Sequence, residues 1–179
     1  FMDWEGYFNK YKEVSINGRY MPPKVVEKIF RRKKGFMNTM SANGHDITCY
    51  KVGTGKIKVL LWSQMHGNES TGTKALFDLF NCFSNTNTKQ LEEILNNCTL
   101  LFVPMLNPDG ALNYTRVNAN NVDLNRDAVG REAKESKLLR KVLEMFDPQF
   151  CFNLHDQRTI FNVEKTTNPA TVSFLAPSE

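Results

Sequence analysis

Short apolar runs alternate with amphipathic stretches through the middle of the chain, and this alternation restricts the fold more than any other feature. Strands are expected at residues 57–63, 99–105 and 150–154, and helices at residues 70–82, 89–95 and 131–146. Continuously apolar strands joined by helices are typical of a buried parallel sheet with right-handed crossovers. The pattern therefore predicts the α/β class: a three-layer sandwich in which helices flank a central sheet that is mostly parallel or mixed.

Further elements are expected on both sides of this alternation. A helix is predicted over residues 23–32, because two prolines favour its start and a glycine follows its basic end. Residues 36–40 and 46–52 flank Asn43-Gly44, a pair typical of a type I′ hairpin turn. One more strand is expected at residues 171–175.

Length and charge restrict the possible partners. The 179 residues suffice for a packed core, and residues 1–179 are interpreted as a single domain. No apolar run approaches the roughly 20 residues that cross a membrane, and no signal peptide is visible. The net charge of +4 is modest, and the basic run at residues 31–34 is interpreted as the solvated end of a helix. We therefore expect a cytoplasmic protein without a nucleic-acid or membrane partner.

The four cysteines are widely spaced and form no CxxC pair. They are Cys49, Cys82, Cys98 and Cys151. Most lie among apolar neighbours in predicted strands or helices, where a cysteine behaves as a small hydrophobic residue. Buried free thiols are therefore favoured over disulfides, which weakly indicates a reducing compartment.

Two histidines and a glutamate follow the ends of expected strands. His66 and Glu69 are three residues apart just after the first strand of the alternation, so a turn there directs both side chains to one point. His155 follows the strand expected at residues 150–154, which is interpreted as buried, and Asp156 beside it is a candidate to orient an imidazole. Two imidazoles and one carboxylate form a ligand set of catalytic zinc sites. His45 is interpreted as a solvated turn residue and excluded.

A long polar loop between residues 107 and 127 supplies further candidates. Arg116 and Arg126 carry planar groups suited to carboxylates or developing oxyanions, and Asn125 adds an amide. Each also has a purely structural interpretation. Arg116 could pair with a surface acid, and Asn125 with Arg126 could cap the following helix.

The order of the motifs is more specific than any one of them. The chain contains HGNE at residues 66–69, NPDG at 107–110, an arginine at 116, VDLNRD at 122–127 and LHD at 154–156. In this order they resemble the zinc carboxypeptidase family. The resemblance implies that His66, Glu69 and His155 hold Zn²⁺. It also implies that Arg116 stabilises the oxyanion of the scissile carbonyl, and that Asn125 and Arg126 bind the substrate's terminal carboxylate.

The sequence departs from this family beyond the last motif. The family's general-base glutamate lies on a late strand, whereas after His155 this sequence holds only Glu164 and Glu179, neither in a similar context. The chain is therefore interpreted as the N-terminal portion of such a domain, without its C-terminal part.

Three functions follow from the motifs. The first is a zinc-dependent hydrolase that releases the C-terminal residue of a peptide by attack of a zinc-activated water. The second is a zinc amidohydrolase of the aspartoacylase or succinylglutamate desuccinylase type, which cleaves small acyl-amino acids and shares the HxxE and DxNR elements. The third is a noncatalytic fragment that binds a metal or a carboxylate.

Overall fold

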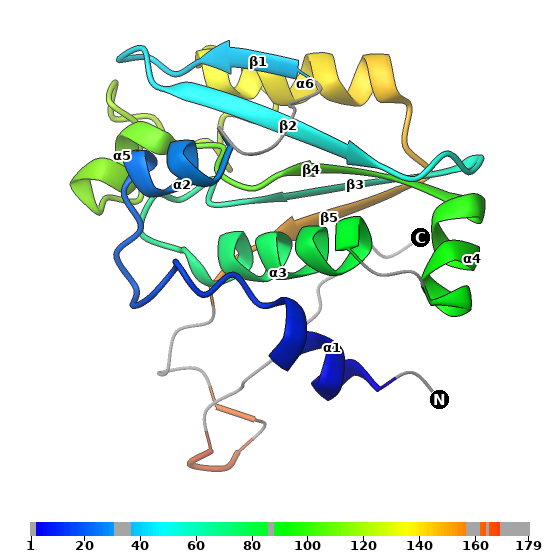
Figure 1. Ribbon diagram of the computed structural model, residues 1–179. Helices are drawn as coiled ribbons and strands as arrows, with labels where there is room; N and C mark the ends of the chain where they lie inside the picture. The colour runs from blue at the N-terminus through cyan, green and yellow to red at the C-terminus, as the bar shows by residue number, and fades with distance from the viewer. Residues whose placement is uncertain (1–2, 31–36, 86–87, 157–161, 164, 169–179) are drawn as a thin grey trace.

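A five-stranded sheet forms the centre of the computed structural model, which describes residues 3–30, 37–85, 88–156, 162–163 and 165–168 (Figure 1). Its strands are β1 (Met37–Met40), β2 (Asp46–Val52), β3 (Ile57–Ser63), β4 (Cys98–Val103) and β5 (Phe150–Leu154). They lie in the order β1-β2-β4-β3-β5.

The sheet is mixed. β3 pairs in parallel with β4 on one side and with β5 on the other, so that Leu60 lies opposite both Leu101 and Cys151. β2 runs antiparallel to β4, and β1 runs antiparallel to β2. Because β3, β4 and β5 point the same way, the loops that follow them meet at one edge of the sheet.

Helices cover both faces of the sheet, as predicted for a three-layer sandwich. The helices of the outer layers are α3 (Thr71–Asn85), α4 (Lys89–Asn97) and α6 (Lys134–Phe146). Adjacent residues of β4 face opposite layers: Leu101 packs in one cluster with Leu138 of α6, and Phe102 packs in another with Leu76 of α3. In Figure 1, α6 lies above the sheet and α3 below it. The two-residue repeat of strands thus gives the sheet two buried faces.

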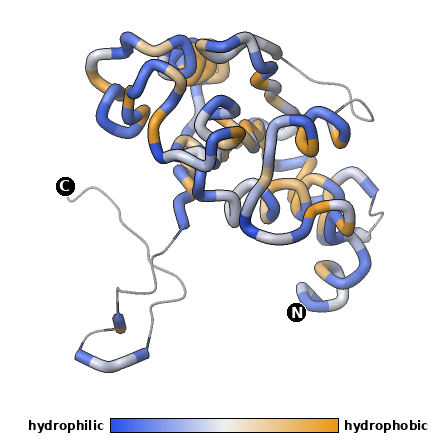
Figure 2. Tube along the Cα trace, turned by 90° about the vertical axis from the view of Figure 1, so that its left-hand side faces the viewer, coloured by the Kyte–Doolittle hydropathy of each residue, from blue (hydrophilic) through white to orange (hydrophobic). Residues whose placement is uncertain are grey.

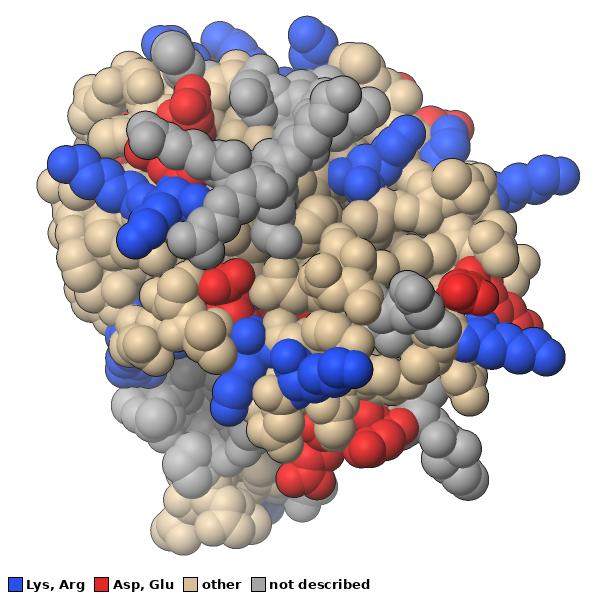
Figure 3. Space-filling view, in the orientation of Figure 1, with Lys and Arg blue, Asp and Glu red and all other residues tan. Residues whose placement is uncertain are grey.

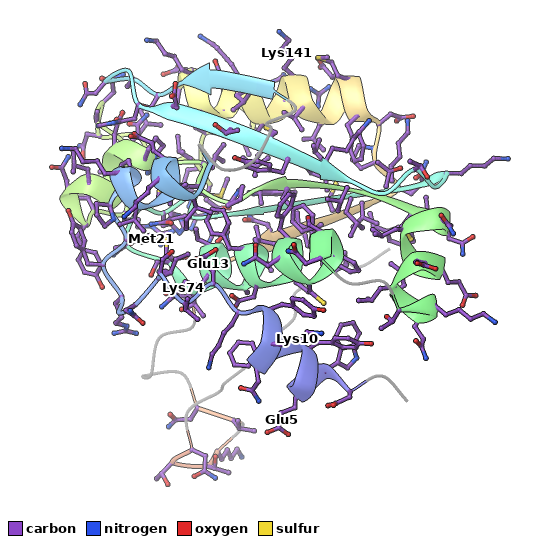
Figure 4. The ribbon with its side chains drawn as sticks, viewed as in Figure 1. Glu5, Lys10, Glu13, Met21, Lys74 and Lys141 are labelled. Atoms are coloured by element: carbon purple, nitrogen blue, oxygen red, sulfur yellow. The ribbon has the colours of Figure 1, made fainter. Side chains whose placement is uncertain are left out.

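The remaining helices pack around this sandwich. They are α1 (Trp4–Tyr11), α2 (Pro23–Phe30) and α5 (Pro108–Asn113). The segment between α1 and α2 runs along α3, where Lys74 Nζ donates to the carbonyl of Gly18 at 2.7 Å and Met21 is buried (Figure 4). Figure 4 shows Lys141 on the opposite side, on the outer face of α6. Figure 2 shows that the short segment at residues 165–168 lies apart from the body of the molecule.

Element boundaries differ from the predictions in ways that have local causes. α6 begins at Lys134 rather than at residue 131, because Asp127 accepts hydrogen bonds from the backbone N–H groups of Glu132 (2.9 Å) and Ala133 (3.0 Å). α1 and α5 were not predicted. α1 carries aromatic residues at helical spacing, Trp4, Tyr7, Phe8 and Tyr11, but none of its residues is buried, and α5 is a single short helix that the side chain of Asn107 caps. The predicted strand at 171–175 and the end of the helix predicted over 23–32 lie outside the described residues.

The hairpin between β1 and β2 is present, but its predicted type I′ turn is wrong. The loop spans residues 41–45, with the N–H of Gly44 donating to Ser41 O at 3.2 Å and that of Ser41 donating to His45 O at 2.9 Å. Within this loop only Gly44 has a positive φ, of 85°, whereas a type I′ turn needs a positive φ at Asn43 as well. Contacts from Asp109 and Glu135 hold this longer turn.

The prediction that β5 is a buried strand is also wrong. Its residues Phe150 and Phe152 are 55% and 45% exposed, because β5 pairs with β3 alone among the described strands. Cys151 is exposed for the same reason, so the expectation of four buried thiols fails there. Cys49 and Cys82 are buried and Cys98 is half-buried, and all four cysteines are free.

Charged side chains of both signs share the surface. Lysine and arginine side chains are interspersed with acidic ones on the face shown in Figure 3. Within the part of the chain that the structure describes, no helix is both long and apolar enough to cross a membrane.

Candidate metal centre

The predicted HxxE pair lies in a tight turn directly after β3. Gln64 begins this turn with a φ of 52°, which is uncommon for a residue other than glycine. It is fully buried, and its side-chain Nε2 donates to the carbonyl of Gly67 at 2.8 Å. Gly67 lies against α5 so closely that a Cβ there would stand 1.9 Å from the carbonyl carbon of Gly110. The turn is therefore fixed by one buried amide and by direct backbone packing.

His66, Glu69 and His155 converge on one point. His66 Nδ1 lies 2.9 Å from Glu69 Oε1, and His155 Nδ1 lies 2.8 Å from Glu69 Oε2. The potential ligand atoms of the three residues all lie within 4.8 Å of one another. The side chain of His66 is 2% exposed and that of His155 is 32% exposed. The cluster therefore has one buried side and one side open to solvent.

The electrostatic environment keeps Glu69 ionised. Burial by itself raises the pKa of this carboxyl, but hydrogen bonds with His155 and His66, together with their charge, hold its pKa well below the usual range. An ionised glutamate between two imidazole nitrogens is the protonation state that a metal ligand requires.

Arg116 lies beside this cluster and is fixed by Asp123. Its Nε donates to Asp123 Oδ2 at 2.9 Å, and its Nη1 lies 3.5 Å from Glu69 Oε1. Asp123 also contacts the buried histidine, with Oδ1 at 3.1 Å from His66 Nε2. Burial raises the pKa of Asp123, but the hydrogen bond and charge of Arg116 lower it by more, so the pKa lies below its usual value. The alternative interpretation, that Arg116 pairs with a surface acid, is wrong, because its partner Asp123 is an acid of the site itself.

Asp156 does not contact an imidazole through its side chain, so its predicted role is wrong. Its Oδ1 accepts from the N–H of Thr71, the first residue of α3, at 3.0 Å. Its backbone N–H donates to Glu69 Oε2 at 3.2 Å. The side chain therefore satisfies a free N–H at the helix start, and Asp123 takes the imidazole contact instead.

Asn125 and Arg126 follow Asp123 in the same loop. The backbone N–H of Asn125 donates to Asp123 Oδ1 and that of Arg126 to Asp123 O, both at 3.0 Å. Arg126 is exposed and Asn125 is half-buried. Neither caps α6, because Asp127 binds the N–H groups ahead of that helix. Glu164 and Glu179, the remaining acids after His155, lie outside the described residues.

Two residues of the site were missed in the sequence. Asp123 stands in the VDLNRD motif, but linear spacing does not show that its carboxylate reaches back over 57 residues to His66. Gln64 gave no signal, because only its positive φ and burial reveal its role. His45 has 4.0 Å contacts with Glu27 and Asp109, away from the metal cluster, so its exclusion agrees with the structure.

The donor set fits a zinc ion. Zinc accepts imidazole nitrogen and carboxylate oxygen, and catalytic sites use three protein ligands and leave one position open. The contact between His66 and Asp123 matches the outer carboxylate that orients many metal-binding histidines. The solvent-exposed side at His155 leaves access for a further ligand.

Comparison with known proteins gives a consistent result. Probable carboxypeptidase 2 of Arthroderma benhamiae is 28% identical over 114 residues, a match that covers 64% of this chain and 21% of that protein. Carboxypeptidase E of Caenorhabditis elegans is 36% identical over 87 residues, which are 40% of this chain and 18% of that protein. This chain thus spans about a fifth of the length of the curated relatives that it matches.

A solved structure shares the fold. A metallo-carboxypeptidase from Pseudomonas aeruginosa, in complex with (2-guanidinoethylmercapto)succinic acid, aligns with a TM-score of 0.66 and 20% identity over 74% of this chain and 39% of that one. The family model described as zinc carboxypeptidase matches residues 32–164, which include β1 to β5 and the whole metal cluster. This chain therefore belongs to the zinc carboxypeptidase family.

Proposed function

We propose that this protein is a zinc-dependent carboxypeptidase, which hydrolyses the last peptide bond of a peptide and releases the C-terminal residue. The observation that carries the proposal is the convergence of His66, Glu69 and His155 within 4.8 Å, beside the guanidinium of Arg116. The zinc carboxypeptidase family to which the chain belongs acts on peptides.

The metal ligands would be Nδ1 of His66, a carboxylate oxygen of Glu69 and Nδ1 of His155. Zinc bound by such a set supplies Lewis-acid polarisation of a carbonyl and a water of lowered pKa. The protein residues set the geometry beforehand. Asp123 holds the ring of His66 from its far nitrogen, and the backbone N–H of Asp156 holds Glu69.

Arg116 is suited to the charge that develops on the carbonyl oxygen during peptide hydrolysis. Its guanidinium is fixed by the 2.9 Å contact with Asp123 while the side chain stays 39% exposed, so a substrate can reach it. A cation held in place before the reaction stabilises a developing oxyanion without reorganisation.

Asn125 and Arg126 would bind the terminal carboxylate of the substrate. A guanidinium pairs with a carboxylate through two parallel hydrogen bonds, and an amide adds a further donor. The N–H of Asn125 donates to the Asp123 carboxylate, which also contacts Arg116 and His66, and the N–H of Arg126 donates to the backbone carbonyl of Asp123. One acid therefore ties the proposed carboxylate-binding residues to the metal cluster.

The amidohydrolase and the noncatalytic fragment are not favoured, because the family model and the relatives are carboxypeptidases. Assays of cleavage on peptides and on N-acyl amino acids distinguish the carboxypeptidase, the amidohydrolase and the noncatalytic fragment. The cytoplasmic location stays a prediction.

Metal analysis tests the site first. The protein is loaded with zinc, desalted and analysed for metal, alongside His66→Ala and the control His45→Ala. We expect one zinc per chain in the parent and in the control, and far less in His66→Ala. Zinc well below one equivalent in the parent would overturn the proposal.

Hydrolysis tests the reaction next. The zinc-loaded full-length protein is incubated with a blocked peptide that has a free C-terminus, with the same peptide as its C-terminal amide, and with N-acyl amino acids. Mass spectrometry should detect release of the last residue from the free acid only, and a chelator should stop it. Cleavage of N-acyl amino acids alone favours the amidohydrolase, and zinc binding without any cleavage favours the noncatalytic fragment.

A further inference from the structure

Glu135, in the first turn of α6, is a fully buried carboxylate outside the metal cluster. Its Oε1 accepts from the backbone N–H of Ala42 at 3.0 Å, and its Oε2 accepts from Nδ2 of Asn118 at 3.1 Å. In the described part of the chain, no lysine or arginine forms an ion pair with it. Burial of a carboxylate without a cation is costly unless its oxygens accept good hydrogen bonds. Its two partners are therefore the groups that keep it in place.

The first partner belongs to the turn between β1 and β2, which is itself firmly held. Asp109, 1% exposed, accepts from Ser41 Oγ at 2.7 Å and from the N–H of Asn43 at 3.1 Å. Two buried acids from different helices thus bind three consecutive residues of this turn. Glu135 is fixed on this side and can hold its second partner in a defined position.

That second partner, Asn118, organises a sharp turn at residues 118–122. Its backbone N–H donates to Val122 O and its carbonyl accepts from Asn121, both at 3.0 Å. Its Oδ1 accepts from the N–H groups of Asn120 and Val122, again at 3.0 Å. Asn118 is 4% exposed, and its remaining polar group, Nδ2, points to Glu135. Every polar group of this asparagine is used.

The turn lies between two residues of the metal centre. Arg116 precedes it and Asp123 follows it, and the two are joined by the 2.9 Å contact that also brings Asp123 to His66. A shift of Asn118 would therefore displace the cation and the carboxylate together.

We propose that Glu135 is a positioning residue. Its hydrogen bond to Asn118 sets the 118–122 turn, and through that turn the placement of Arg116 and Asp123 beside the metal-binding residues. The proposal rests on the proposed function only in treating Arg116 and Asp123 as parts of a working site.

A reciprocal exchange of the two side chains tests the contact. Glu135→Gln places an amide NH₂ opposite either Asn118 Nδ2 or the N–H of Ala42, so one bond is lost. Asn118→Asp places two carboxylates face to face. The double variant restores both bonds, because Gln at 135 donates to Asp at 118 and accepts from Ala42. Glu144→Gln, on the exposed side of the same helix, is the control.

Two measurements that need no catalysis decide the outcome: exchange of the backbone amides by NMR, and zinc affinity by competition with a chelating dye. In each single variant the amides of Asn120 and Val122 should exchange about 10-fold faster, as for one lost hydrogen bond. Zinc affinity should fall about 10-fold, at the low end for an outer partner of a metal ligand. The double variant should recover both properties, and the control should match the parent.

Three results would overturn the proposal. They are unchanged exchange at Asn120 and Val122 in both single variants, faster exchange spread equally over β3 and β4, or a double variant that does not recover. If the single variants do not fold, recovery of a folded double variant supports the pairing, and its failure to fold overturns it. If the parent binds no zinc, the proposed function fails while the exchange data still decide the role of Glu135.

Discussion

Oδ1 of Asp123 lies 3.1 Å from Nε2 of His66, on the far side of the imidazole from Glu69. A carboxylate only accepts, so this contact places a proton on Nε2 and directs Nδ1 toward Glu69. We expect Asp123→Asn to weaken zinc binding about 10- to 100-fold, the usual effect of losing such a partner. Competition titration measures it, with the exposed Asp46→Asn as control. Equal affinities of the two variants would contradict the assignment.

Gly67→Ala should destabilise the protein and disturb the metal centre together. A Cβ at this position would stand 1.9 Å from the carbonyl carbon of Gly110, so α5 and the turn that follows β3 must move apart. We expect the free energy of unfolding to fall by about 1–3 kcal/mol, as for overpacking in a core. Denaturant titration tests this against Gly130→Ala, where the nearest atom lies at 3.3 Å in an exposed loop. Identical midpoints for the two variants would show that the turn adapts freely.

Thiol labelling should distinguish two cysteines. Burial raises the pKa of Cys49 to about 12, so its thiol is neither accessible nor ionised at neutral pH. Cys151 lies exposed on β5. With iodoacetamide and the native protein, we expect peptide mapping to find Cys151 modified first and Cys49 modified only after denaturant is added. Labelling of both at the same rate would mean that β2 opens readily.

Acid should weaken the loop ahead of α6 through Asp127. Burial raises its pKa, but the N–H groups of Glu132 and Ala133 lower it more, so the folded pKa lies below the ordinary 3.8. A depressed pKa means that this stabilisation is present above the unfolded value and is lost as pH falls through the folded value. Asp127→Asn should therefore be less stable than the parent at neutral pH, with the difference shrinking below about pH 4. Urea titrations across this range measure it, and a constant difference would exclude the linkage.

Much of the fold could be predicted, because burial on two faces leaves a strong pattern. β3 and β4 carry continuous apolar runs, and α3, α4 and α6 carry apolar stripes, so their existence and order follow from the sequence. Features set by tertiary contacts could not be predicted. The conformation of the hairpin loop is set by the buried carboxylates of Asp109 and Glu135, which come far later in the chain. The exposure of β5 depends on which strands lie beside it.

In the metal centre, too, some residues could be predicted from the sequence and others could not. His66, Glu69 and His155 were found because histidines at strand ends must meet at one edge of a parallel sheet, and the structure brings them together. Asp123 was missed, because linear spacing does not show that its carboxylate reaches His66 across 57 residues. Asp156 stands next to His155 in the sequence, but its side chain turns to the N–H of Thr71, and adjacency does not reveal that direction. The roles of Asn125 and Arg126 in substrate binding stay predictions.

The contact between Glu69 and His155 closes a loop of 86 residues and joins the end of β3 to the end of β5. Closing a long loop removes more freedom from the unfolded chain than closing a short one, and metal binding adds its free energy to folding. A ligand bridging these two residues would secure the exposed last strand to the sheet. The same three side chains that we assign to hydrolysis would then also govern how often this edge frays, so metal loss should be felt as local unfolding as well as lost activity.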